Sequence, residues 1–517
     1  MSIFDSVKGM RVPKNKFDLS HEKKMSMKMG TLTPFLLQEI IPGDSFRVNT
    51  EMLMRLQPML APIFHRVRVK TDYFFVPNRL VWENWQKFIT GGDTGADNPV
   101  HPYITIDNTG RGNFAKGSLA DYMGIPPVET PTVSAEGQLQ INALPFRAYQ
   151  LVYNEYYRDQ NLQSEVTVNK TDGAIATGSA EYNSLLTMRN RAWEKDYFTS
   201  CLPWAQKGGP VVVPSETVYH ADGSKLIRAD TGLPLPNEAG IKSVAGGVLE
   251  GTGSAGIPAN IDNLEGVNIT VNDLRVAVRL QEWLERNARA GSRYIENILA
   301  NFGVLSSDAR LQRPEWLGGN INPIVISEVL STYQNADDSG YPQGTMAGHG
   351  ISTGGNGGFK RKFEEHGFVI GLMTIIPRTA YQQGVDKMWS RFDKLEYAWP
   401  SFAQLGEQAV LNQELYYNPE DTGIDITNKA TFGYQSRYAE YKYKPSTVHG
   451  DFRDNLDYWH MGRKFTAAPV LNEAFIKADP TKRIFAVTDP TEDEILCQIY
   501  NRVDAIRPLP YFNSPTL

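Results

Sequence analysis

Apolar and polar side chains alternate from Arg66 to Tyr73 in the stretch 66–77, which reads RVRVKTDYFFVP. A period of two residues is that of a β-strand with one buried face. The apolar face collects Val67, Val69, Thr71, Tyr73 and Phe75, and the opposite face begins with basic residues. The pattern predicts a strand that is apolar inward and basic outward and that stops at Pro77.

Two further segments carry strand patterns. Residues 368–377 (FVIGLMTIIP) are apolar at almost every position, which predicts a central strand covered on both faces. Near the C-terminus one face of residues 495–503 is apolar, at Ile495, Cys497, Ile499 and Val503. We expect a last strand there, running into an extended tail from Pro508.

Three segments have helical spacing instead. Residues 181–200 and 272–302 place apolar side chains at intervals of three and four, with Asn272 as a candidate cap and an expected break at Gly291. A shorter helix is expected after Pro145, with an aromatic stripe at Phe146, Tyr149, Tyr153 and Tyr156. Such a stripe is more often part of a core than a platform for nucleic-acid bases.

The composition changes abruptly between residues 205 and 266. This segment holds eleven Gly, five Pro and a single aromatic residue, Tyr219. It cannot contribute much to a shared core, although short apolar patches near 210–214 and 224–228 predict small strands. We interpret it as a surface insertion, and long excursions of this kind usually serve function. Two smaller Gly-rich stretches, 91–112 and 340–358, are predicted to be mobile surface loops.

The overall composition narrows the class of protein. In 517 residues, 44 Gly and 31 Pro favour a turn-rich β protein, and a formal net charge of -6 excludes a surface that is basic all over. Only Cys201 and Cys497 are present, so neither a disulfide framework nor a zinc ribbon can form from them. The N-terminus lacks the apolar run of a signal peptide, and no segment has the length and hydropathy of a membrane span. We expect the chain to fold in a cytoplasm.

Basic residues gather at the N-terminus. Residues 1–30 carry a net charge of +4, which leaves about -10 for the rest of the chain. A flexible basic arm on an acidic body can neutralise a polyanion without making the whole surface adhesive. The candidate nucleic-acid contacts are Lys8, Arg11, Lys14, Lys16, Lys23, Lys24 and Lys28. The alternative is a merely solvated tail.

Catalytic motifs are not found in the sequence. There is no HExxH pair, no GxxxxGK[ST] phosphate loop and no GxSxG elbow, and the glycines of 348–358 miss the dinucleotide-binding spacing. His449 and His460 bracket a segment with acids that could hold a cation, but the alternating ligand spacing of a calcium loop is missing. We therefore predict no catalytic residue, no cofactor and no metal site.

Several short motifs occur in an order that resembles one known family. They are Gly43-Asp44-Ser45-Phe46, Arg55-Leu56-x-Pro58, Phe75-Val76-Pro77, Trp85-x-x-Phe88-Ile89, the stretch 293–303 and Glu365-His366-Gly367. Each motif is weak alone, but their ordered occurrence is similar to the major capsid proteins of the microviruses, small single-stranded-DNA phages. The long insertion 205–266 is most similar to the gokushovirus branch.

The resemblance implies a mainly β fold, a single eight-stranded antiparallel jelly roll (β-barrel) with long helical and loop insertions. It further implies a virion protein that assembles in the bacterial cytoplasm, without membrane insertion, into a T=1 icosahedral shell around circular single-stranded DNA. Residues 205–266 would form a protrusion at the threefold axes that contacts a host surface receptor. Implied partners are an internal scaffolding protein, a small basic DNA-packaging protein and a minor (pilot) protein.

The expected organisation is a basic arm (1–30), a first part of the jelly-roll body (31–204), the Gly-rich protrusion (205–266), and a second part of the body with an extended tail (267–517). Two other classes remain open on the sequence, a carbohydrate-binding or hydrolytic jelly-roll protein and a non-viral DNA-binding module. The size of the assembly distinguishes them, because a shell protein forms very large closed particles or their precursors.

Overall fold

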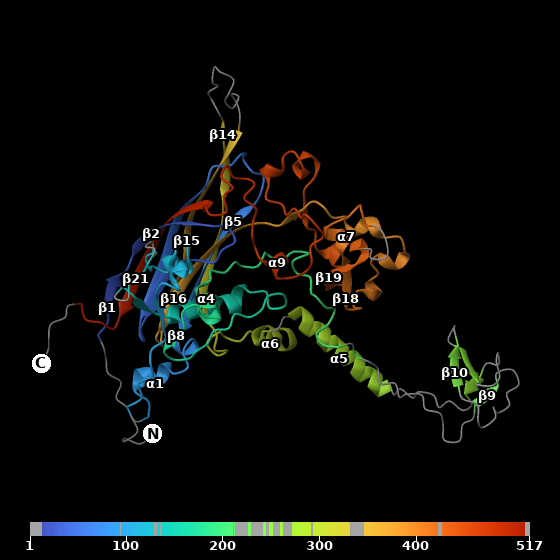
Figure 1. Ribbon diagram of the computed structural model, residues 1–517, viewed down its shortest axis with the longest axis horizontal. Coiled ribbons are helices and arrows are strands. Elements are labelled where there is room, and N and C mark those ends of the chain that lie inside the picture. The colour runs from blue at the N-terminus through green and yellow to red at the C-terminus, as the bar shows by residue number, and fades with distance from the viewer. Residues whose placement is uncertain are drawn as a thin grey trace, which may run out of the picture. The chain divides into compact units, whose positions relative to one another are not determined.

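A computed structural model gives the architecture of the chain (Figure 1). It describes residues 13–93, 95–128, 132–134, 137–209, 211, 226–228, 241–244, 248–251, 259–261, 271–290, 293–330, 346–421 and 427–511. Lys8 and Arg11, two of the predicted nucleic-acid contacts, lie outside these residues, as do parts of the stretches 205–266 and 340–358.

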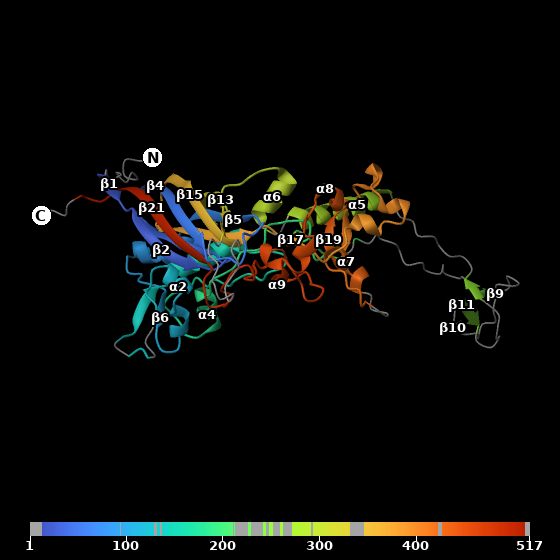
Figure 2. The ribbon, with the colours of Figure 1, turned by 90° about the horizontal axis from the view of Figure 1, so that it is seen from above.

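Two antiparallel sheets form the centre of the molecule. The first has the order β1-β21-β4-β15-β14, with β2 also paired to β21, and its strands lie side by side in Figure 2. Their bounds are β1 Asn15–Asp18, β2 His21–Met27, β4 Ser45–Leu56, β14 Val325–Leu330, β15 Met346–Lys362 and β21 Ile495–Arg507. The second has the order β13-β5-β16-β3, with bounds β3 Thr33–Ile40, β5 Val67–Pro77, β13 Glu315–Pro323 and β16 Gly367–Pro377.

The chain passes from sheet to sheet in a jelly-roll order. With β1 and β2 counted as one strand and β14 as an extension at the edge, the first sheet takes strands one, eight, three and six, and the second takes five, four, seven and two. This confirms the predicted antiparallel jelly roll with insertions. The sheets are not joined into a closed barrel by any ladder among the described strands, so the β-barrel of our expectation is a two-sheet sandwich here.

The strand predictions from periodicity are confirmed. Strand β16 is buried along its whole length and lies between β5 and β3. Its odd-numbered side chains, such as Val369, enter the core between the sheets, and its even-numbered ones, such as Ile370, enter a second core. In β21 the predicted face, Ile495, Cys497, Ile499 and Val503, is buried while its neighbours are exposed.

Two long insertions carry the helices. The connection from β5 to β13 holds α1 Trp85–Thr90, α2 Leu119–Tyr122, α3 Leu144–Val152, α4 Ala180–Leu186, α5 Val271–Ala290 and α6 Tyr294–Phe302, with strands β6 Tyr103–Ile106, β7 Leu139–Asn142 and β8 Ala174–Ile175. The connection from β16 to β21 holds α7 Asn412–Leu415, α8 Ala439–Lys442 and α9 Glu473–Ile476, with β17 Ala380–Tyr381, β18 Glu407–Leu411, β19 Thr431–Ser436 and β20 Ser446–Thr447. Among the described helices, none combines the length and the apolar character that crossing a bilayer requires.

The first insertion covers the outer face of the second sheet. Phe146 and Tyr149 of α3 pack with Phe74 of β5 and Ile370 of β16 in the second core. The aromatic stripe is therefore core, as predicted. The predicted break near Gly291 is confirmed as well, since α5 ends at Ala290 and α6 begins at Tyr294.

Residues Gln206–Arg289 form a compact unit of their own, separate from the unit made by Met1–Ala205 and Ala290–Leu517. This smaller unit holds α5 and two short antiparallel pairs. The pairs are β9 Leu226–Arg228 with β12 Ala259–Ile261, and β10 Ile241–Val244 with β11 Val248–Gly251. Helix α5 leaves Leu274, Val278 and Trp283 exposed.

One predicted helix is wrong over most of its length. Helix α4 ends at Leu186, and the residues after it pair with distant backbone through the bridges Thr31↔Asn190 and Ala192↔Lys477. Trp193 also donates its backbone N–H to the carbonyl of Ile476, at 2.9 Å. Tertiary hydrogen bonds thus replace the helical ones that the spacing of apolar residues favoured.

The prediction that the stretches 91–112 and 340–358 are mobile surface loops is wrong in part. Residues 346–358 belong to β15, which pairs with β4. Glycine is required at one of these close approaches, because a Cβ at Gly358 would lie 2.1 Å from the carbonyl oxygen of Val48. In the stretch 91–112, strand β6 buries Ile104 and Ile106 in the second core. Glycine content alone does not distinguish a mobile loop from a strand that needs close packing.

Candidate nucleic-acid interface

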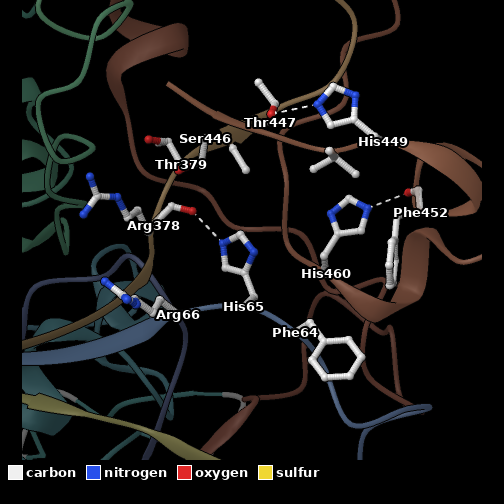
Figure 3. A pocket seen from close by; sticks show the side chains of 12 residues that line it. Phe64, His65, Arg66, Arg378, Thr379, Ser446, Thr447, His449, Phe452 and His460 are labelled. Carbon is white, nitrogen blue, oxygen red and sulfur yellow. Dashed lines mark hydrogen bonds between the residues drawn. The ribbon is translucent and has the colours of Figure 1, made fainter. Parts of the chain in front are cut away.

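A pocket of about 580 Å³ lies between the β4–β5 connection and the insertion that follows β16 (Figure 3). One wall is Phe64, His65 and Arg66, and the opposite wall comes from residues 378–380 and 446–460. The lining side chains include Arg378, Thr379, Thr447, His449, Phe452 and His460. Basic, aromatic and hydroxyl groups therefore converge from three separate segments of the chain.

Backbone hydrogen bonds hold the walls together. The N–H of Arg378 donates to the carbonyl of Arg66 at 2.9 Å, and His65 Nε2 donates to the carbonyl of Arg378 at 2.5 Å. Strand β17 pairs in parallel with β20, which places Thr447 and His449 at the rim. The site is assembled by pairing between strands far apart in the sequence.

Two histidines of the pocket, His65 and His460, are held neutral. Burial lowers the pKa of His65 to about 4, and burial together with the nearby guanidinium of Arg483 lowers the pKa of His460. His460 Nε2 donates to the carbonyl of Phe452 at 2.7 Å while its Nδ1 accepts from the N–H of Gly462 at 2.9 Å, an assignment that requires one neutral tautomer. The guanidinium groups of Arg66 and Arg378 supply positive charge to the lining of the pocket.

An aromatic ledge borders the pocket. The Phe64 side chain is 73% exposed, and its ring stacks on Trp459 with centroids 5.6 Å apart and planes 17° apart. Phe452 meets Phe64 edge-on at 6.4 Å. An exposed ring on a pocket that arginines also line can bind an unpaired base by stacking, while a phosphate of the same strand contacts a guanidinium group.

A second basic surface lies on the solvent-facing side of the first sheet. Strands β2, β4 and β21 expose Lys24, Arg55 and Gln498 there, around a shallow hollow of about 590 Å³. Leu53 and Leu496 supply exposed apolar side chains between them. This face can contact a polyanion by charge, without the groove geometry that would read a sequence.

The described N-terminal residues are not a flexible arm. Residues 15–27 form β1 and β2, both paired with β21, so the expected flexibility is wrong for this part of the chain. The cause is the long β21, whose free edge accepts both short strands as partners.

Most of the predicted lysines have partners within the protein. Lys14 donates to the carbonyl of Gly43, Lys16 pairs with Asp504 at 2.7 Å, and Lys28 donates to the carbonyl of Pro490 at 2.8 Å. Lys23 donates to the carbonyls of Pro34 and Tyr122, and burial lowers its pKa to about 8. Lys24 is different, because its side chain is 76% exposed and lies 4.0 Å from Glu22. Lys24 is thus the described member of the set that is best placed to contact DNA.

The sequence did not reveal the pocket. The available signal was an aromatic residue, Phe64, directly before the basic stretch 65–70 (HRVRVK). Its exposure became visible only in the structure. The sequence predicts no cation site at His449 and His460; the structure places both side chains in the pocket, with His449 Nε2 2.9 Å from Thr447 Oγ1. Within the described residues, no group of three or more His, Cys, Asp or Glu could hold a metal ion.

Comparison with known proteins covers almost the whole chain. The family model described as "Capsid protein (F protein)" matches residues 5–517. Three relatives are each named "Capsid protein VP1" and each align over 99% of this chain and 97% of their own length. They come from Chlamydia phage 1 (36% identical), Bdellovibrio phage phiMH2K (36%) and Spiroplasma virus 4 (30%).

Proposed function

Because the chain belongs to the F-protein family of phage capsid proteins, and is therefore a structural protein that builds a virion shell from copies of itself, we propose that its shell is a T=1 particle around circular single-stranded DNA. The family is one of non-enzymatic proteins, which removes the hydrolytic alternative. The gokushovirus relatives support the small shell and the single-stranded genome.

The pocket beside Phe64 supports the contact with DNA. Its exposed ring and its two arginines offer stacking and charge without base-specific hydrogen bonding, which suits a genome bound at many equivalent subunits regardless of sequence. We place this pocket and the face around Lys24 on the inner side of the shell. Lys14, Lys16, Lys23 and Lys28 would then contribute mainly by anchoring β1 and β2.

Other parts of the proposal concern partners. The unit Gln206–Arg289 would be the protrusion and the surface that contacts a host receptor, because it is compact in itself and exposes apolar side chains on α5. An internal scaffolding protein, a small basic DNA-packaging protein and a pilot protein would assist assembly in the bacterial cytoplasm.

Electron microscopy of particles from cells that express the complete phage genome tests the shell and its contents. We expect closed particles of one small size, whose nucleic acid resists nuclease until the shell is opened and is then degraded by a nuclease specific for single strands. Particles of mixed or large size, or a double-stranded genome, would contradict the proposal.

The DNA contact is tested with Phe64→Ser. Since stacking of a base on an aromatic ring contributes about 1–3 kcal/mol, dissociated subunits should bind oligo(dT) roughly 5- to 150-fold more weakly. Leu139→Ser, at another exposed apolar side chain on β7, is the matched control and should bind as the native chain does. Equal affinity of the Phe64→Ser and native chains would remove the pocket from the DNA interface.

A further inference from the structure

The insertion between β16 and β21 exposes an aromatic crest, which we define as Trp389, Phe392, Leu395, Tyr397 and Trp399. The Phe392 side chain is 90% exposed and that of Trp389 is 69% exposed. Exposed apolar groups of this size in one short segment mark an interaction surface on a water-soluble particle. They are not scattered single residues, because all five lie within eleven positions of the sequence.

The backbone of the crest is ordered by capped turns. Asp386 and Asp393 accept hydrogen bonds from the N–H groups of Met388 and Leu395, at 3.0 and 3.1 Å. Glu396 accepts from the N–H groups of Phe392 and Asp393. The aromatic rings are thus presented by a fixed scaffold, which reduces the entropy lost when a partner binds them.

The charges at the base of the crest are paired within the protein. Arg391 and Glu440 are both nearly buried and lie 2.8 Å apart, and the Arg391 guanidinium lies 4.3 Å from the centre of the Tyr441 ring. Lys444 pairs with Asp386. The segment 386–399 holds three acidic and three basic residues, so it has no net charge to attract a polyanion, and an apolar partner surface suits the crest best.

A groove of about 820 Å³ on the same unit has that character. It lies between α6, β13 and the segment that joins them, and it exposes Leu299, Leu305, Trp316 and Ile321. The Leu305 side chain is 75% exposed. The crest and the groove are therefore both uncovered in the single chain.

The charged groups of the groove are also paired internally. Arg313 lies 3.3 Å from Asp308 and 3.8 Å from Glu155, and Arg293 lies 3.3 Å from Glu296. Asp72 pairs with Lys70 at 3.2 Å and accepts a hydrogen bond from Trp316 Nε1 at 3.1 Å. An inserted apolar side chain would leave these pairs intact, whereas an inserted charge would have no partner.

We propose that the aromatic crest of one subunit docks into this groove of a second copy of the chain. The two surfaces match in form, one protruding and one hollow, and neither carries a strong net charge, because acidic and basic residues are nearly equal in number on each. Two different patches in contact make a heterologous interface, which forms a ring when its rotation closes, as the symmetry axes of a closed shell require. The proposal rests on the capsid function, which supplies the neighbouring copies.

Cysteine cross-linking in assembled particles tests this pairing. The double variant Phe392→Cys with Leu305→Cys is treated with the thiol oxidant diamide, which takes up the two hydrogens as each disulfide forms. The native Cys201 and Cys497 are buried and provide a low background. We expect a ladder of disulfide-linked oligomers from the double variant and only monomer from either single variant.

Particles assembled from a mixture of the two single variants test whether the contact is head-to-tail. A head-to-tail contact predicts linked dimers and nothing larger, since each chain then carries one thiol. Dimers from Phe392→Cys alone would show crest against crest and overturn the pairing. Intact particles of the double variant without any cross-link would also overturn it, while leaving the capsid function in place; native chains that form no particles would instead overturn the capsid function itself.

Discussion

At the scale of single residues, surroundings decide the chemistry of the basic side chains. Lys23 and Lys24 are neighbours in the sequence, yet Lys23 is held by two carbonyl groups while Lys24 is largely exposed. His65 is kept neutral by the walls of its pocket. The residue type gives the available chemistry, and burial determines which protonation state is stable.

His65 should make the folded subunit sensitive to acid. Its pKa is about 4 when folded and 6.5 when unfolded, so the unfolded chain binds the proton first as the pH falls. The free energy of unfolding should therefore decrease from pH 6.5 to about pH 4. His65→Gln should lessen this decrease by about 1–2 kcal/mol after allowance for partial exposure.

Urea unfolding of dissociated subunits at pH 7.0, 5.5 and 4.5 measures this effect. His460 also has a lowered pKa, so a smaller slope should persist in the variant. Identical slopes for the native and His65→Gln subunits would contradict the assignment.

At the scale of elements, β16 joins the two cores of the body. It pairs with β5 on one edge and β3 on the other, and it faces the jelly-roll core and the helix-covered core with alternate side chains. Strand β14 lies at the end of its sheet and has mostly exposed side chains. Packing should therefore make β16 much less tolerant of substitution than β14.

Ile370→Ala should lower the free energy of unfolding by about 2–5 kcal/mol, because it leaves a cavity in a fully buried site. Val325→Ala, at an exposed position of β14, is the matched control and should change it by less than about 0.5 kcal/mol. Urea unfolding of both variants gives the comparison. A similar decrease in the free energy of unfolding for both variants would show that β16 does not hold the cores together.

At the scale of the whole molecule, the large insertion can be separated from the body. Residues Gln206–Arg289 form their own compact unit, and the jelly-roll cores contain no residue from it. We therefore expect the body to fold without the insertion, as the proposed role of the insertion in host recognition requires.

Replacing residues 205–266 with a short Gly/Ser bridge should leave the body folded and soluble while adsorption to the host cell is lost. Circular dichroism and size-exclusion chromatography check the body, and binding of particles to host cells checks adsorption. An insoluble body would place the segment in the core, and normal adsorption would place the receptor contact elsewhere.

The sequence alone determined the strands with strong periodicity, the break between α5 and α6, and the family pattern. These features are local, since the period of apolar residues and the positions of Gly and Pro do not depend on distant contacts. Prediction from the sequence was wrong where distant contacts decide the structure. Examples are the chain after Leu186, the glycine-rich β15, and the paired β1 and β2.

Only the tertiary structure decided the candidate sites. The pocket joins Phe64, Arg378 and His460, and the groove joins β5 to α6 and β13, because particular strands pair and bring these segments together. The burial of Lys23 likewise depends on carbonyl groups from β3 and α2. A linear pattern fixes which face of a strand is apolar, but long-range pairing fixes which side chains meet.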